Sequence, residues 1–254
     1  MAESRRPNDT HGDRYSNWES LAKEADPSRT SVALAKMIRA PRPEEMRILN
    51  AFGKGKANTG DYAWWGQSRW PEFCFTFAAG LAPEDVLHRL RLTEDREQAG
   101  FATIEVGPAD GGSIMVEWAG QAGILRDVVR DLSLGTSIAS VERNVNHHSH
   151  FIHAIDGRTV ASLDPMFPNW TYSAEPEQLR QDLEELGMIS EANHDDDDDS
   201  DGFFPHYIEA ALALAERRTG VRLEPRHLQR DALSHRASIA RYYDRPDGTF
   251  PELA

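Results

Sequence analysis

The sequence contains very little cysteine, and this scarcity excludes several kinds of site at once. Cys74 is the single cysteine among 254 residues, so the chain can form neither an internal disulfide nor a zinc site built from cysteine ligands. A reducing, cytoplasmic setting is the simplest expectation. Cys74 itself stands between Phe73 and Phe75 in a strongly apolar segment, where a buried thiol is unreactive.

Long apolar runs are missing as well. No stretch reaches the roughly 20 residues that are needed to span a bilayer, and the basic residues near the amino terminus precede no apolar segment of the kind a signal peptide requires. The sequence also lacks a glycine-rich phosphate loop and the G-x-S-x-G motif of α/β-hydrolases. These absences predict no membrane partner and disfavour the commonest nucleotide and acyl-transfer chemistries.

Basic residues are fewer than acidic ones. The 28 lysines and arginines stand against 42 aspartates and glutamates, a net charge of −14, which argues against nucleic acid as a partner of the whole chain. Residues 29–56 are the exception, with seven basic and two acidic residues. This basic arm contains Arg39, Arg42 and Arg47 as candidate binding residues. It could dock on a protein partner, fold onto the protein's own acidic surface or contact phosphates, and the acidic remainder disfavours the last.

Composition divides the chain into four parts. We expect a disordered start (1–16), a basic helical arm with a glycine-rich linker (17–60), an α+β domain with an acidic insertion at 191–202 (61–242), and a tail (243–254). Within the arm, apolar spacing predicts helices at 31–40 and 43–52. The aspartate run inside the insertion lacks the final glutamate of a calcium-binding loop and is expected to be a solvated segment.

The centre of the predicted fold is a hairpin at about 148–163. Asp156 and Gly157 form a two-residue turn signal that joins antiparallel strands. Extending the pairing from this turn places His153 opposite Val160 and Phe151 opposite Ser162. Apolar patterns predict further strands, and helices such as one at about 121–133, so the expected class is α+β with a mixed or largely antiparallel sheet packed by helices, plus the N-terminal helical arm.

Two histidines of this hairpin are candidate metal ligands. His148 and His150 are two residues apart on a predicted strand, so both imidazoles would point to one face, as in several metal enzymes. A third ligand would have to come from elsewhere, with Glu142 and Asp164 as candidates. The alternative is a polar turn with a core histidine that donates to a carbonyl group. Apart from such a divalent metal, no cofactor is expected.

Three tryptophans open the α+β domain. Trp64, Trp65 and Trp70 form either the floor of the core or a recognition surface, because tryptophan is common in both settings. The core is the favoured interpretation. If they face solvent, they are candidate binding residues together with the arginines of the basic arm.

Five sequence blocks resemble a family of uncharacterised actinobacterial proteins that carry a domain of unknown function. In order, they are FCFTFAAGLAPEDVLHRL, IMVEWAG, LSLGT, SVERNVN followed by FIHAIDGRTVASLDPMFP, and AALALAERRTGVRLEP. They match the family's GLxPExxLxRL, RNVN, D-G hairpin and AERxTGVxL motifs and cover about Asp61 to Leu228. The resemblance implies no known activity and no catalytic residue. The basic arm and the aspartate run depart from the pattern.

Three functions follow from these observations. The leading expectation is a non-enzymatic interaction or regulatory protein that binds a basic protein partner, with toxin neutralisation as one form of that role. The alternative is a metal-assisted enzyme that uses His148 and His150. The third is association with nucleic acid through the basic arm. Partner identity and oligomeric state lie beyond the sequence.

Overall fold

The structure is a computed structural model of the whole chain, and it describes residues 42–52, 56–67, 70–168, 171–189, 205–229 and 232–244. The chain divides into two compact units, residues 1–37 with residue 253 and residues 38–252 with residue 254. All described residues belong to the second unit. The predicted disordered start, the helix at 31–40, the acidic insertion and all but two residues of the tail lie outside the described residues.

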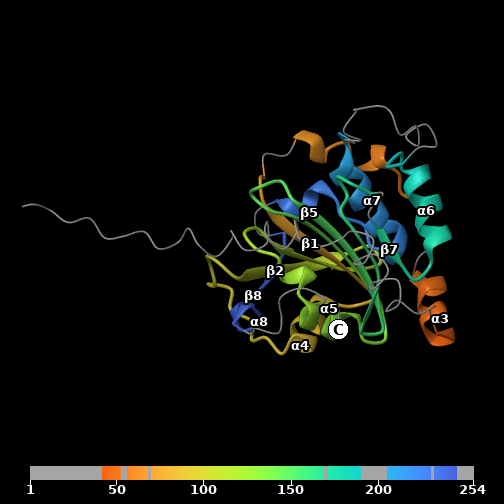
Figure 1. Cartoon of the computed structure of the whole chain (residues 1–254). Coiled ribbons are helices and arrows are strands. Elements are labelled where there is room, and N and C mark those ends of the chain that lie inside the picture. Colours follow the sequence, from red (N-terminus) through yellow and green to blue (C-terminus); the bar gives the residue numbers. More distant parts are fainter. Residues whose placement is uncertain are drawn as a thin grey trace, which may run out of the picture. The chain divides into compact units, whose positions relative to one another are not determined.

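Eight strands form one sheet in the order β7-β6-β5-β4-β1-β3-β2-β8 (Figure 1). Each neighbouring pair is antiparallel, which confirms the predicted α+β class with a largely antiparallel sheet. The strands are β1 (Phe73–Ala79), β2 (Thr103–Ala109), β3 (Gly112–Glu117), β4 (Ser137–Arg143), β5 (Ser149–Ile155), β6 (Arg158–Leu163), β7 (Thr171–Ser173) and β8 (His235–Ser238). All seven residues of β1 are buried, as expected of an inner strand covered on both faces.

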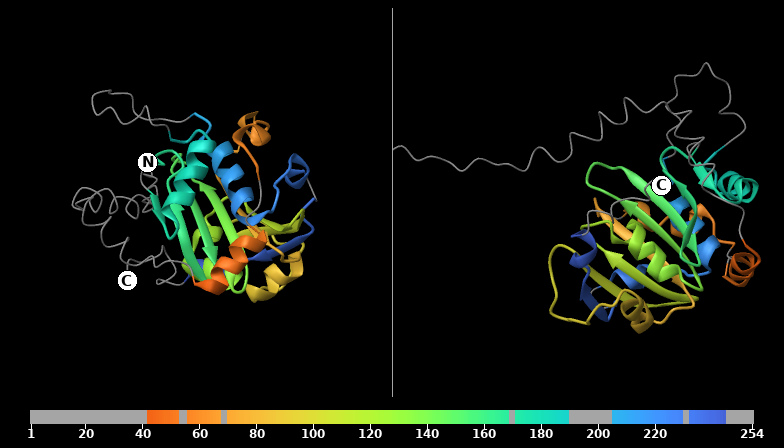
Figure 2. Two further views of the ribbon diagram at one scale, coloured as in Figure 1. Left: turned by 90° about the vertical axis from the view of Figure 1, so that its right-hand side faces the viewer. Right: turned by 60° about the horizontal axis from the view of Figure 1, so that its bottom comes forward.

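Helices cover both faces of this sheet (Figure 2). The α-helices are α3 (Pro43–Phe52), α4 (Pro83–Arg89), α5 (Arg126–Ser133), α6 (Pro176–Glu185), α7 (Tyr207–Thr219) and α8 (Ala240–Tyr243). The 3-10 helices are η1 (Thr59–Tyr62), η2 (Trp65–Gln67), η3 (Ala122–Ile124) and η5 (Pro225–Leu228). One apolar core lies between the sheet and α7, and the other lies between the sheet and α4, α5 and η3.

Helix α7 lies on the first face and is buried on almost every side, because residues 210–215 are all alanine or leucine. Its alanines are small enough for the helix to lie close against β4 and β1, while η1 packs on it from outside. The Tyr62 hydroxyl of η1 donates a hydrogen bond of 2.8 Å to Glu216 of α7. Within the described residues, no helix is both long enough and apolar enough to cross a membrane.

The central hairpin forms where the sequence predicts it, but its register differs. Asp156 and Gly157 have φ values of 48° and 79°, and the turn pairs Ile155 with Arg158 as expected. A β-bulge between His153 and Ala154 then shifts the pairing by one residue.

The predicted partners of His153 and Phe151 were therefore wrong. His153 pairs with Ala161 rather than Val160, and Phe151 pairs with Leu163 rather than Ser162. The shift turns Ala161 and Leu163 toward the α7 core, beside Phe151, where both are buried. The alternation of apolar and polar residues along one strand cannot reveal such a bulge, because the bulge depends on which face of each paired strand is buried.

Candidate functional site

A row of polar side chains crosses one face of the sheet near one of its ends. Cys74 of β1 pairs with Glu117 of β3 on one side and with Glu142 of β4 on the other, and Glu142 pairs with His150 of β5. Directly paired residues of an antiparallel sheet point to the same face. Asp164 follows β6 and lies close enough to His150 for the charges to interact. We call these five residues, Glu117, Cys74, Glu142, His150 and Asp164, the acidic row.

Glu72 adds a carboxylate at the end of the sheet. It stands two residues before Cys74 and is half-buried. Its negative charge raises the pKa of Glu117 and of Glu142, so its carboxyl group lies near both. Burial also raises the pKa of Glu72 itself. Three acidic residues therefore flank Cys74 in the sheet, two on the neighbouring strands and one in the segment that leads into β1.

Only one of the two carboxyl oxygens of Glu117 accepts hydrogen bonds. Its side chain is 2% exposed, and its Oε2 atom accepts hydrogen bonds from the backbone N–H of Ala122 (2.7 Å) and from the Tyr243 hydroxyl (2.8 Å). Its Oε1 atom is buried and has no hydrogen-bond partner. Burial raises the pKa of Glu117 despite these two donors. An unpaired buried acceptor is uncommon in a folded protein and calls for an explanation.

Glu142 carries the largest perturbation among the carboxylates of the row. It is 3% exposed, and its Oε2 atom lies 3.8 Å from Nδ1 of His150. Burial, together with the charges of Glu72 and Asp164, raises the pKa of Glu142 from 4.5 to about 8. Burial raises the pKa of Asp164 and lowers that of His150. At neutral pH, His150 therefore supplies little positive charge, and Glu142 is largely protonated.

The row lacks a strong cation. Among the described residues, no ion pair joins lysine or arginine to Glu72 or to a carboxylate of the row. Arg143, which follows Glu142 in β4, pairs with Phe73 and lies on the opposite face, with its guanidinium 5.3 Å from the centre of the Phe73 ring. Carboxylates buried without a cation favour the protonated form, which is why their pKa values are raised.

The middle of the row is closely covered by the backbone at Gly123. A methyl group on Gly123 would lie 2.1 Å from Oγ1 of Thr76 and 2.9 Å from Sγ of Cys74. Burial raises the pKa of the Cys74 thiol well above its usual value, and Glu117 and Glu142 raise it further. A thiol kept protonated and covered in this way is a poor nucleophile.

Exposed apolar side chains surround this end of the sheet. Trp70 (46% exposed) precedes β1, Phe101 (70%) precedes β2, Val145 (58%) joins β4 to β5, and Phe167 (47%) follows β6. We call these four residues the apolar rim. In the part of the chain that the structure describes, five large apolar side chains are exposed, and the fifth, Leu134, lies at the opposite end of the sheet.

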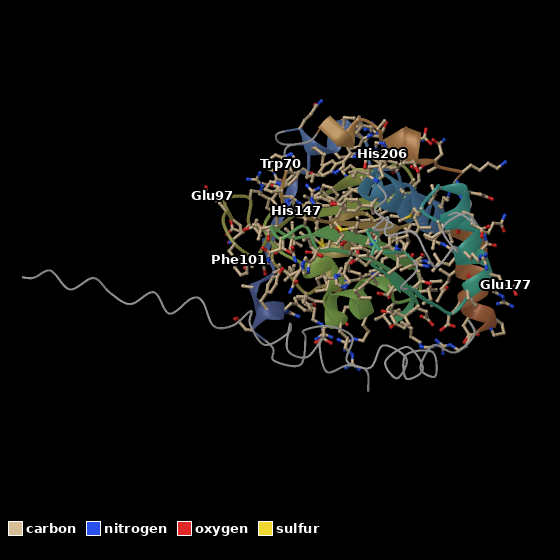
Figure 3. The ribbon with its side chains drawn as sticks, turned by 45° about the horizontal axis from the view of Figure 1, so that its top comes forward. Trp70, Glu97, Phe101, His147, Glu177 and His206 are labelled. Atoms are coloured by element: carbon tan, nitrogen blue, oxygen red, sulfur yellow. The ribbon has the colours of Figure 1, made fainter. Side chains whose placement is uncertain are left out.

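One aromatic contact connects the rim to the row: the Phe101 ring lies 5.3 Å from that of Tyr243, whose hydroxyl donates a hydrogen bond to Glu117. The Trp70 ring lies 4.3 Å from that of Trp118, which packs against Phe75 on the face of the sheet opposite to Glu117. Figure 3 shows Trp70 and Phe101 toward the same side of the molecule. We refer to the apolar rim, the acidic row and Glu72 together as the sheet-end surface.

The three tryptophans considered as core or binding residues lie in different surroundings. Trp65 belongs to the core and makes edge-on contacts with Phe73 (4.8 Å) and Phe75 (5.3 Å). Trp64 is half-buried beside Trp65, with ring centres 6.0 Å apart. Trp70 lies in the apolar rim.

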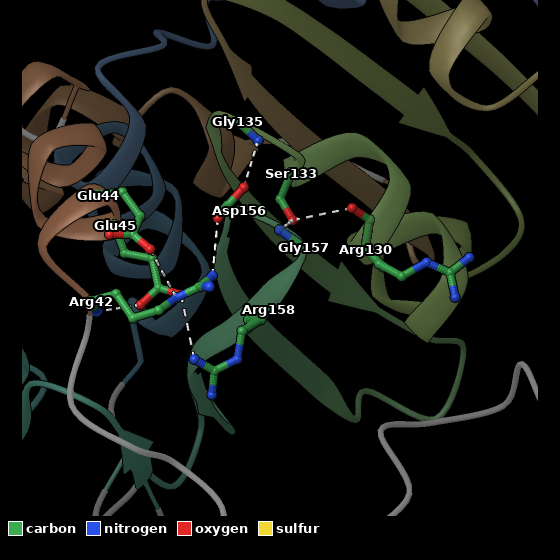
Figure 4. A network of polar contacts seen from close by, with 9 residues as sticks. All are labelled: Arg42, Glu44, Glu45, Arg130, Ser133, Gly135, Asp156, Gly157 and Arg158. Carbon is green, nitrogen blue, oxygen red and sulfur yellow. Dashed lines mark hydrogen bonds and ion pairs between the residues drawn. The ribbon is translucent and has the colours of Figure 1, made fainter.

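The three candidate binding arginines of the basic arm also differ in their surroundings. Arg39 lies outside the described residues, and Arg47 is exposed on α3. Arg42 is engaged within the chain, 2.9 Å from Glu45 and 3.0 Å from Asp156 in the hairpin turn (Figure 4). Asp156 also accepts a hydrogen bond from the Gly135 N–H (3.1 Å). The residue Arg42 thus ties the start of α3 to the sheet.

The predicted metal ligands occupy different surroundings. His148 is exposed in the turn before β5, where its N–H donates to the Asn144 side chain (3.1 Å), while His150 lies on β5 in the acidic row. Both suggested third ligands, Glu142 and Asp164, come close to His150. Across the described ranges, however, no three side chains of His, Cys, Asp or Glu are arranged to hold a metal ion. The metal site remains a prediction.

Several residues of the sheet-end surface were not singled out from the sequence. They are Glu72, Phe101, Glu117, Val145 and Phe167. Only strand register brings the two glutamates of β3 and β4 to either side of Cys74, and register between segments so far apart leaves no local signal. Exposed aromatic residues next to predicted strand ends were the one available indication.

Fold and site together define an antiparallel α+β protein with a charged and aromatic surface at one end of its sheet. The chain belongs to the family of unknown function DUF6461, whose model matches residues 93–240, more than half of its length. The matched segment contains β2 to β8, whereas Trp70, Glu72 and Cys74 precede it. Searches of curated proteins and of solved structures give no significant match.

Proposed function

We propose that this chain is a non-enzymatic interaction protein that binds a basic protein partner through the sheet-end surface. Regulation of that partner, or neutralisation of a toxic one, is the role that such binding would serve. The gathering of the apolar rim at one end of the sheet carries the proposal. Exposed apolar groups that collect in one region are typical of interaction sites, and tryptophan and other aromatic residues dominate interface energetics.

Charge supports a basic partner. The sequence carries a net charge of −14. Within that total, the carboxyl groups of the acidic row have no lysine or arginine partner among the described residues. A basic protein would be drawn toward such a surface, which would raise its association rate at low salt. Apolar contacts at the rim would then supply most of the affinity.

The test compares two sets of exposed apolar residues in a pull-down from the cells in which the protein is made. The first variant combines Phe101→Ala and Phe167→Ala in the apolar rim. The matched control is Leu134→Ala, which removes a similarly exposed side chain at the opposite end of the sheet. Captured proteins are identified by mass spectrometry, and the dissociation constant of the purified complex is then measured for each variant.

We expect one basic, stoichiometric protein with the original chain and with the Leu134 variant, and its loss with the rim variant. Loss of two hot-spot side chains corresponds to a dissociation constant weaker by roughly 100-fold or more. Equal capture by all three chains would assign binding to another surface. Capture by none would remove the support for an interaction role.

A metal-assisted enzyme around His148 and His150 is the second candidate. The proximity of His150 to Glu142 and Asp164 favours it, since these groups are common ligands of divalent metals. Elemental analysis of the purified protein tests this function. Stoichiometric metal that disappears in the His150→Ala variant would support it, and a metal-free protein that gains none on incubation with zinc or manganese would exclude it.

A further inference from the structure

An arginine at this end of the sheet is held by aromatic and backbone contacts rather than by a carboxylate. Arg143 of β4 pairs with Phe73 of β1 and with Ser149 of β5, so its side chain lies on the face that α7 covers. Its guanidinium lies 5.3 Å from the centre of the Phe73 ring, and its Nη2 atom donates a hydrogen bond to the carbonyl oxygen of Trp70. Among the described residues, no aspartate or glutamate forms an ion pair with Arg143.

The guanidinium of Arg143 also keeps most of its hydrogen-bonding capacity. Such a group carries five N–H donors, whereas the carbonyl oxygen of Trp70 is the one acceptor bonded to it within the described part of the chain. The Nε atom is buried without a hydrogen-bond partner, and the bond from Nη2 lies at the protein surface. Because the side chain is half-buried and rests on a ring, an anion that binds there meets donors that are already oriented.

A pair of tryptophans lies beside this cation. The Trp70 ring is 4.3 Å from that of Trp118 and inclined to it by 31°, and Trp118 is anchored in turn by an edge-on contact of 5.8 Å with Phe75. Trp70 is 46% exposed, and Trp118 is half-buried. Since the carbonyl group of Trp70 bonds to Arg143 while its ring packs on Trp118, one residue joins the cation to an exposed aromatic surface.

We propose that Arg143 and the Trp70–Trp118 pair form a subsite for the C-terminal carboxylate of a protein partner whose last residue is aromatic. This proposal rests on the proposed function, because the terminus belongs to the partner that binds the sheet-end surface. The carboxylate accepts hydrogen bonds from the guanidinium, and the terminal ring packs against the exposed part of Trp70.

Two arguments favour a chain terminus as the occupant. A C-terminal aromatic residue carries its carboxylate and its ring close together, as Arg143 and the tryptophan pair are placed in this protein. The carboxylate of an aspartate or glutamate side chain would need a second residue to supply the ring. A basic partner also has this one anionic group whatever its net charge, so the subsite is compatible with the acidic row on the other face of the sheet.

The subsite can be tested without knowing the partner. The probe is N-acetyl-phenylalanine, and the control is N-acetyl-phenylalanine amide, which has the same ring but no charge. A third compound, N-acetyl-aspartyl-phenylalanine amide, carries its carboxylate on a side chain. The indole NMR signals of the six tryptophans of the whole protein are followed during titration at constant ionic strength, and single Trp→Phe variants assign them.

We expect saturable shifts of the Trp70 and Trp118 signals with N-acetyl-phenylalanine, with a dissociation constant on the order of 1–10 mM. The uncharged amide should bind at least about tenfold more weakly, because it lacks the charge-assisted hydrogen bonds. The aspartyl compound should also bind more weakly than the probe, since its carboxylate and its ring belong to different residues.

Variants locate the binding within the protein. Arg143→Gln is expected to weaken binding of the probe at least about tenfold, and Trp70→Ala should weaken binding of the probe and of its amide alike. The matched control is Arg241→Gln, because Arg241 likewise lies over a ring, 4.9 Å from that of Tyr242, and donates to the carbonyl oxygen of Arg91 (3.1 Å). It should leave binding unchanged. The NMR spectra report whether each variant is folded, and Trp70→Ala replaces Arg143→Gln if the latter is not.

Four results would overturn the subsite: no saturable shift with the probe, equal binding of its amide, tighter binding of the aspartyl compound, or unchanged binding in the folded variants. Its failure can be told apart from failure of the proposed function. If the rim variant loses a captured partner while the probe does not bind, the sheet-end surface stands and the subsite falls. If the probe binds as expected but no partner is captured, the subsite is supported and the interaction role is not.

Discussion

Replacing Glu142 with glutamine is expected to stabilise the protein, and to do so increasingly as the pH rises. Burial and the nearby carboxylates raise the pKa of Glu142 from 4.5 to about 8 in the folded protein. Between these two values the unfolded chain releases the proton while the folded chain retains it. The free energy of unfolding therefore falls as the pH rises through this range. Glutamine has no proton to release and removes the effect.

The size of the gain follows from the two pKa values. Each pKa unit corresponds to about 1.4 kcal/mol, so the full difference would be worth roughly 5 kcal/mol at about pH 8. Structural relaxation and water penetration reduce such values in real proteins, and the buried amide of glutamine needs its own hydrogen bonds. We expect a net gain on the order of 2 kcal/mol at about pH 8, and little gain at about pH 5.

Urea denaturation of both chains at several pH values measures this difference directly. Subtracting one series from the other cancels the titrating groups that do not interact with Glu142, and so leaves Glu142 with its neighbours Glu72 and Asp164. Glu97→Gln serves as the control and should leave the free energy of unfolding unchanged at each pH. A Glu142→Gln variant that is less stable than the original at every pH, or whose gain does not vary with pH, would refute the assigned protonation of Glu142.

Two further predictions concern the hairpin. His153 is buried, with Nε2 3.0 Å from the Ser137 hydroxyl, and burial lowers its pKa well below 6.5. At acidic pH the unfolded chain protonates His153 while the folded chain does not. The free energy of unfolding should therefore fall by up to roughly 1.4 kcal/mol for each pH unit below about 6.5. His153→Gln should make this fall with pH less steep in acid denaturation. Asp156→Ala should destabilise the protein by about 1–2 kcal/mol through loss of the Arg42 ion pair and the Gly135 hydrogen bond. Asp156→Asn, which retains an acceptor and tolerates the positive φ, should cost less in a thermal denaturation experiment.

Local signals were sufficient for the framework of the fold. The Asp156-Gly157 turn predicted a hairpin because few other dipeptides accept positive φ at both positions. The same signal could not reveal the bulge that follows, since an extra residue in β6 is favoured only by the core it helps to fill. The helix expected at 121–133 begins at Arg126, because residues 122–124 instead form η3 over Cys74. The close contact between Gly123 and β1 determines where the helix begins, and helix propensity cannot predict such a contact.

The candidate site was harder to predict from the sequence, because it too depends on contacts between distant segments. Glu142 and Asp164 were recognised as possible partners of His150, since all three belong to one continuous hairpin region. Glu117 was not, because its position depends on the pairing of β3 with β1, which are separated by α4 and β2. Composition alone also could not tell the buried Trp65 from the exposed Trp70, which differ only in their packing.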